Sequence, residues 1–141
     1  MATTYQAASA APTPRALQLW TGRILTALVI LFLGADAAGK LIAPMTMIAH
    51  SPPLGLPATS GFYRLLGAIL GLATALYAWQ RTAFLGALLL TGYLGGAVAT
   101  HLRVGSPLFG YTLFGVYVGI MLWGGLWLRD SRIRALLPLN R

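Results

Sequence analysis

LQLWTGRILTALVILFLGADAAGKLIA, residues 17–43, is the stretch that decides the fold. It exceeds the ~20 residues that an α-helix needs to cross the hydrocarbon core of a bilayer. Its residues are mostly apolar, yet it carries Asp36 and, one helical turn later, Lys40. An ionisable residue at membrane depth is costly and is a functional-site hypothesis by default. The stretch therefore predicts a membrane-spanning helix with a charged pair that needs an explanation.

The composition of the whole chain also indicates a membrane protein. Hydrophobic residues make up 57% of the 141 residues and charged residues only 9%, whereas a soluble domain has roughly 25% charged residues. The net charge of +8 does not indicate nucleic-acid binding, because the basic residues stand singly at the ends of apolar runs and form no stripe that follows phosphates. The chain has no cysteine, which excludes disulfides and thiol chemistry by this chain alone.

Four apolar runs follow one another along the chain, and we predict an all-α, polytopic membrane protein built as a compact bundle of four transmembrane helices. Backbone groups in lipid must hydrogen-bond internally, and no barrel-like alternation is visible, so the runs are expected to be helices. Their predicted bounds are 17–43, 61–79, 82–102 and 108–128. Residues 1–16 are predicted to form a disordered tail, and residues 129–141 a basic tail at the membrane surface.

The connection at 44–60 contains four prolines and cannot be one continuous helix. Residues 35–37, Ala-Asp-Ala, also have the small-x-small form of a signal-peptide cleavage site. The apolar run continues beyond them to Ala43, which favours a retained membrane span over a cleaved signal.

The basic residues predict the orientation of the four spans. The two ends of the chain and the connection at residues 80–81 share one side of the membrane. Most arginines lie on that side, namely Arg15, Arg23, Arg81, Arg129, Arg132, Arg134 and Arg141, whereas Lys40, Arg64 and Arg103 lie on the other. Cytoplasmic loops carry the excess of Lys and Arg, so both termini are predicted to be cytoplasmic.

This topology brings the remaining polar residues to the outer end of the predicted bundle. Asp36 and Lys40 are four residues apart and can pair. The cations there outnumber the single carboxylate and could receive an anionic or carbonyl-bearing ligand. We predict Asp36, Lys40 and His101 as catalytic residues and Arg64, Arg103, Tyr111 and Thr112 as binding residues, with no metal site.

Each of these residues also has a purely structural interpretation. Asp36 and Lys40 could form a salt bridge that only holds the helix, with Lys40 reaching toward the interface. Arg64 and Arg103 could be interfacial anchors, and His101 could bond a carbonyl at its helix end. The convergence of all these residues on one end is what favours a site.

Several segments match a known pattern: FLGADAAGKL at 32–41, GLP at 55–57, GGAVATHLRVGSPLF at 95–109 and WGGLWLRD at 123–130. On these segments the chain resembles the DoxX-like family of small four-helix bacterial membrane proteins. The resemblance implies a bacterial inner-membrane location. It also implies Lys40, His101 and Arg103 as site positions, and a connection with redox systems, since one relative is a subunit of a thiosulfate:quinone oxidoreductase.

Three functions are compatible with these observations. The first, which the resemblance favours, is an accessory protein or subunit of a membrane redox system linked to quinone, with no cofactor of its own beyond that quinone. The second is a small membrane enzyme or binding protein for an amphiphilic molecule of quinone or isoprenoid type. A channel or transporter is the least favoured, because polar residues should then cross the membrane rather than stop at one end. The sequence leaves open the partner, the homo-oligomeric state and whether the protein is an enzyme.

Overall fold

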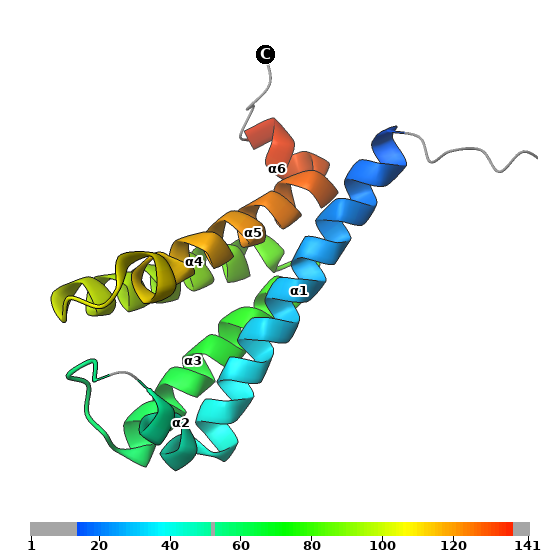
Figure 1. Ribbon diagram of the computed structural model, residues 1–141. Coiled ribbons are helices and arrows are strands. Elements are labelled where there is room, and N and C mark those ends of the chain that lie inside the picture. Colours follow the sequence, from blue (N-terminus) through cyan, green and yellow to red (C-terminus); the bar gives the residue numbers. More distant parts are fainter. Residues whose placement is uncertain (1–13, 52, 137–141) are drawn as a thin grey trace, which may run out of the picture.

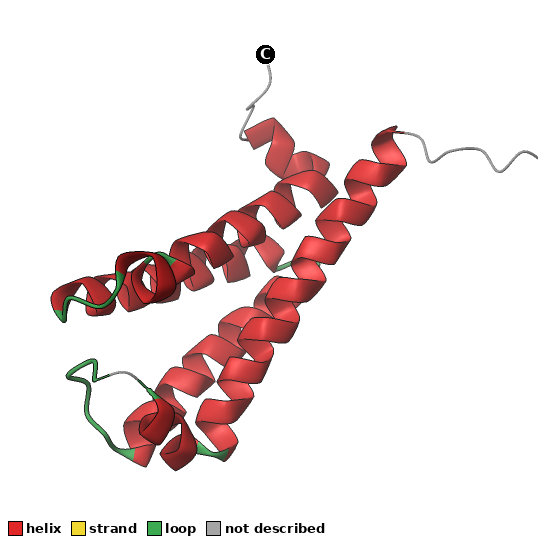
Figure 2. Cartoon of the chain, viewed as in Figure 1, coloured by secondary structure: helices red, strands yellow, loops and turns green. Residues whose placement is uncertain are grey.

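The computed structural model describes residues 14–51 and 53–136, and helices make up nearly all of them (Figure 2). Three long helices, one shorter one and a π-helical turn build the transmembrane part, and two short helices flank it. Their bounds are α1 Pro14–Ile42, α2 Pro44–His50, α3 Ser60–Ala78, α4 Ala83–Arg103, the π-helix η1 Leu108–Thr112, α5 Phe114–Arg129 and α6 Ser131–Leu136.

Four segments of this helical chain are long and apolar enough to cross a membrane: α1, α3, α4 and the combined η1–α5 segment. Large apolar side chains such as Leu31, Ile69 and Ile120 are exposed along them, as expected of helices whose outer faces contact lipid instead of water. The predicted fold class, an all-α membrane protein with four transmembrane helices, is confirmed.

The four spanning segments form two pairs that separate toward one end (Figure 1). Helix α1 contacts α3 and α5, and α4 contacts the same two helices. The N-terminal half of α1 packs on α5, where Thr26 meets Gly125, and its C-terminal half packs on α3, where Lys40 meets Gly67. Because α1 changes partner along its length, α4 and α5 diverge from α1 and α3 toward the end that carries α2 (Figure 1).

The closed end of this V holds a polar anchor within the apolar core. Tyr77 of α3 is fully buried among residues such as Leu122 and Leu126. Its hydroxyl donates to the Leu122 carbonyl at 2.8 Å and lies 3.5 Å from the Thr26 hydroxyl. The Arg129 guanidinium lies 5.5 Å from the centre of the Tyr77 ring. One tyrosine thereby ties α1, α3 and α5 together, since a buried hydroxyl must find partners.

Two pairs of helices approach closely because a glycine lies at each contact. A Cβ on Gly86 of α4 would lie 2.2 Å from the Tyr77 nitrogen, so this glycine lets α4 fold back tightly on α3. A Cβ on Gly67 of α3 would lie 2.8 Å from the Lys40 Cβ and 3.0 Å from the Ala37 carbonyl oxygen. Close backbone approach of this kind is how membrane helices gain packing energy in lipid.

The first connection is partly helical, which the proline content alone does not reveal. Pro44 occupies the first turn of α2, a position that tolerates proline because the N–H there has no helical partner. Residues 53–59 form no helix, and the Thr59 hydroxyl accepts a hydrogen bond from the Phe62 N–H at 3.3 Å and caps α3.

The termini differ in part from the sequence-based bounds. Residues 1–13 of the predicted disordered tail lie outside the described residues, and α1 already begins at Pro14. In the predicted C-terminal tail, α6 runs from Ser131 to Leu136 with Ile133 buried, while residues 137–141 lie outside the described part. The predicted fourth span, 108–128, begins with the π-helical turn η1 and continues as α5.

Candidate functional site

A cleft of about 550 Å³ lies between the two helix pairs at the open end of the V. Its walls are largely apolar, with Phe32 and Leu33 of α1, Leu66 of α3 and Leu94 of α4 among them. Its polar lining residues are Asp36, Lys40, Ser51, Tyr63, Tyr93, Thr100, His101 and Tyr111. Pockets of this size with apolar walls and few polar groups are typical small-molecule sites.

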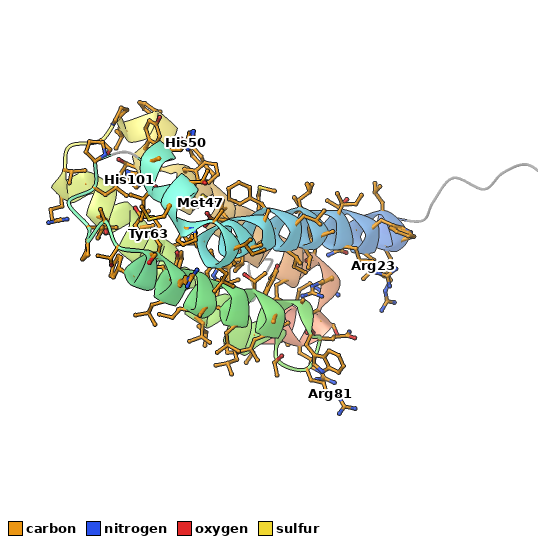
Figure 3. The ribbon with its side chains drawn as sticks, turned by 90° about the horizontal axis from the view of Figure 1, so that it is seen from below. Arg23, Met47, His50, Tyr63, Arg81 and His101 are labelled. Atoms are coloured by element: carbon orange, nitrogen blue, oxygen red, sulfur yellow. The ribbon has the colours of Figure 1, made fainter. Side chains whose placement is uncertain are left out.

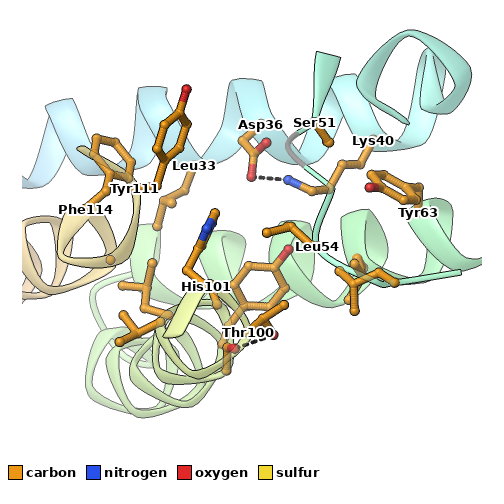
Figure 4. A pocket seen from close by; sticks show the side chains of 18 of the residues that line it. Leu33, Asp36, Lys40, Ser51, Leu54, Tyr63, Thr100, His101, Tyr111 and Phe114 are labelled. Carbon is orange, nitrogen blue, oxygen red and sulfur yellow. Dashed lines mark hydrogen bonds and ion pairs between the residues drawn. The ribbon is translucent and has the colours of Figure 1, made fainter. Parts of the chain in front are cut away.

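Asp36 and Lys40 lie on the face of α1 that lines the cleft, where they form an ion pair (Figure 4). The spacing of four residues stacks the two side chains on one helix face. The Lys40 side chain is 15% exposed and the Asp36 side chain 30% exposed. Close contact with Gly67 of α3 fixes where the base of Lys40 lies.

His101 lies in the last turn of α4 and is held from two sides. Its Nδ1 lies 3.0 Å from the Ser106 hydroxyl, and its ring stacks on Tyr111 with centroids 5.9 Å apart. The Ser106 N–H donates to the His101 carbonyl at 3.0 Å, which brings the following segment back over the helix end. Figure 4 shows the His101 ring directed toward α1, where Asp36 lies.

The η1 π-helix is what brings Tyr111 to His101. The Pro107 carbonyl accepts from the N–H groups of both Tyr111 and Thr112 at 3.2 Å, and the Leu108 carbonyl accepts from Leu113 at 2.8 Å. These hydrogen bonds widen the first turn after Pro107. Such π segments often occur at functional sites, because the wider turn redirects the side chains that follow.

Arg103 does not line the cleft but bonds to Leu54, which does. Its guanidinium donates through Nη2 to the Leu54 carbonyl at 2.7 Å, which ties the first connection to the end of α4. The next residue, Gly55, has a φ of +63°, and a Cβ there would lie 3.2 Å from the guanidinium. Left-handed backbone with a side chain packed against it strongly favours glycine.

The other predicted binding residues have separate places. Arg64 is exposed on α3 and is absent from the lining of the cleft. Thr112 is buried, and its hydroxyl donates to the Ser106 carbonyl at 3.3 Å, which supports the η1 turn. Of the seven predicted site residues, four line the cleft, namely Asp36, Lys40, His101 and Tyr111, whereas Arg64, Arg103 and Thr112 do not.

The sequence-based reasoning missed two tyrosines in the cleft. Tyr63 of α3 is only 7% exposed and lies one turn before Gly67, on the face that meets Lys40. Tyr93 of α4 lines the same cleft as Asp36. The four-residue spacing from Tyr63 to Gly67, a glycine suited to close packing, is the signal that could have identified Tyr63.

The ends of the molecule differ in the groups they carry. Arg23 and Arg81 lie at one end and His50 and His101 at the other (Figure 3). His50 binds back to the Thr46 carbonyl through Nδ1 at 2.8 Å and does not line the cleft. In the described ranges, no three His, Asp or Glu residues come together as a metal site would require. The chemistry that the cleft residues offer is hydrogen bonding and proton exchange.

Comparison with known proteins gives a family for this chain. The model of the DoxX-like family matches residues 24–125, a range that contains every residue of the cleft. No curated protein and no solved structure matches the chain. The family match covers most of the sequence and agrees with the resemblance seen in the sequence segments. With four helices suited to span a bilayer, the chain is a multi-pass membrane protein that belongs to the DoxX-like family.

Proposed function

We propose that this protein binds an amphiphilic molecule of quinone or isoprenoid type, with the polar head at the outer end of the bundle. The observation that carries the proposal is the cleft itself. Its apolar walls suit a ring or an isoprenoid chain, and Asp36, Lys40 and His101 lie together among its polar lining residues. A ligand that enters from lipid needs this combination, because burial of a polar head costs free energy unless it is hydrogen-bonded.

The proposal extends to a quinone-linked redox role in the bacterial inner membrane, with both termini in the cytoplasm. The chain would hold the quinone while a partner enzyme supplies or removes electrons. Family membership and the basic end marked by Arg23 and Arg81 support this proposal. By the positive-inside rule, the basic end of such a protein would face the cytoplasm.

Catalysis by the chain itself is the second candidate, and the fixed geometry of His101 favours it. The hydrogen bond to Ser106 and the stacked Tyr111 ring orient the imidazole, as is required of a group that exchanges protons with a bound head. The test is reduction of a quinone by the purified protein and an added chemical reductant, without a partner enzyme. A rate above that of the reductant alone, lost in His101→Gln with binding retained, would establish this function instead of an accessory one.

A side chain that fills the cleft tests the binding proposal. Ala97 lies at the centre of the α4 lining, one turn after Tyr93 and one turn before His101, so Ala97→Phe projects a ring into the cleft. Ala99→Phe is the matched control, because Ala99 is exposed and lies outside the lining. The measurement is thermal unfolding of each purified protein with and without decylubiquinone.

We expect decylubiquinone to stabilise the wild type and Ala99→Phe but not Ala97→Phe. At a ligand concentration 100 times the dissociation constant, the gain is about 2.7 kcal/mol. The proposal fails if no protein is stabilised, or if Ala97→Phe is stabilised as much as the control.

A further inference from the structure

The charges in the cleft point to a narrower class of ligand. We infer that the cleft selects an uncharged head, a hydroxyl or a carbonyl, over a phosphate or carboxylate, and that Tyr63 is a residue that binds this head. The inference rests on the proposed function, because it specifies the ligand of the same cleft.

The charged side chains that line the cleft compensate each other. The sequence alone suggests an excess of cations at this end. Among the described residues that line the cleft, however, Lys40 is the only Lys or Arg and Asp36 the only Asp or Glu, and the two pair with each other. Arg64 is exposed and Arg103 binds the Leu54 carbonyl. Neither lines the cleft. The charge of Lys40 is therefore already compensated, and the described lining offers an anionic head no unpaired Lys or Arg.

The Tyr63 hydroxyl is available to a ligand in the cleft. The Tyr63 residue is 7% exposed, so more than nine-tenths of it is covered. Within the described residues the Tyr63 hydroxyl makes no hydrogen bond. Unlike the Arg129 Nε atom, which is fully buried without a partner, this hydroxyl remains accessible. In Figure 4 the hydroxyl is directed toward the cleft beside Lys40. A covered tyrosine normally finds a partner, and here the open side is the cleft.

Together these groups form a site for a neutral head. Tyr63 offers a donor and an acceptor, and Asp36 binds Lys40 through Oδ2 only, which leaves its second oxygen as an acceptor. A phosphate would lose its hydration among apolar walls and meet Asp36 without a free cation to compensate. A hydroxyl loses far less hydration and recovers it through these two residues.

A matched pair of probes tests the inference. We would use farnesol and farnesyl phosphate, each with the same photoreactive diazirine in its chain, on the protein in uncharged detergent at pH 8. The readout is the probe concentration at half-maximal labelling of the cleft peptides, with Ala97→Phe as the background.

We expect the farnesol probe to label at a concentration about tenfold or more lower than the phosphate probe. Tyr63→Phe should weaken the farnesol probe about three- to tenfold, the value of one hydrogen bond. Tyr117→Phe should leave it unchanged, because Tyr117 is exposed and outside the lining. Asp36→Asn leaves Lys40 unpaired and should shift the preference toward the phosphate probe.

The possible failures are distinguishable. Equal labelling by both probes, or tighter labelling by the phosphate, with both absent from Ala97→Phe, would overturn the neutral-head inference and keep the proposed function. An unchanged farnesol affinity in Tyr63→Phe would overturn the role of Tyr63. Labelling that is the same in wild type and Ala97→Phe for both probes would overturn the proposed function as well.

Discussion

At the scale of single residues, an ion pair with Lys40 lowers the free-energy cost of placing Asp36 in a membrane helix. Lys40 lies one turn away and pairs with Asp36, so the two charges are partly buried as an ion pair. A paired charge is far less costly than an isolated one. The position of the pair depends on Gly67, because the close approach of α3 at this glycine sets the base of the Lys40 side chain.

Alanine substitutions at two glycines should therefore have opposite effects. A Cβ at Gly67 would meet the Lys40 Cβ at 2.8 Å, whereas a Cβ at Gly119 would meet nothing within 4 Å. Gly67→Ala should destabilise the protein by about 1–3 kcal/mol through overpacking. Gly119→Ala should be neutral or stabilise it by up to about 1 kcal/mol through helix propensity. Unfolding in mixed micelles measures both values, and equal effects would contradict the packing.

At the scale of elements, the cleft is a consequence of how α1 changes partner. Its N-terminal half is in contact with α5 at Gly125, and its C-terminal half is in contact with α3 at Gly67. The α4–α5 pair consequently diverges from α1 toward the end that carries α2 (Figure 1). Residues 53–59, which precede α3, are held to the end of α4, because the Leu54 carbonyl accepts a hydrogen bond from Arg103.

Removal of that hydrogen bond should loosen the connection without unfolding the bundle. Arg103→Met takes away the donor to Leu54, while Arg64→Met, an exposed position outside the cleft, serves as the control. A spin label on Ala58→Cys should become more mobile in Arg103→Met only. An exposed charge-assisted hydrogen bond contributes about 1 kcal/mol, so the global stability should change little. Equal mobility in both variants would show that Arg103 does not hold the connection.

The sequence predicts where the helices lie along the chain better than it predicts which face of each helix points into the bundle. The apolar runs identify four spans, and the spacing of Asp36 and Lys40 indicates their pairing. In a soluble helix the polar face reveals which side is buried, but in α3 both the lipid-facing Leu65 and the buried Leu70 are apolar. The pattern therefore could not show that Tyr63 faces the cleft and Arg64 does not. Contacts between helices decide that rotation.

At the scale of the whole molecule, the proposed orientation yields a prediction that the composition makes simple to test. The chain has no native cysteine, so single cysteines can be introduced without a background. Ala58 and Gln80 are exposed, lie in connections, and are on opposite sides in the proposed topology. A membrane-impermeant maleimide added to intact cells should label Ala58→Cys and label Gln80→Cys only after lysis. The reverse pattern would place the termini outside.

We propose above that the cleft between the two helix pairs holds an amphiphile. Native mass spectrometry of the protein extracted gently from its own membranes tests this claim most directly. Wild type and Ala99→Phe should each carry one amphiphilic molecule per chain that survives mild activation, and Ala97→Phe should carry none, because its ring occupies the cleft. A wild-type protein with no bound molecule, or an Ala97→Phe variant that retains it, would contradict the claim.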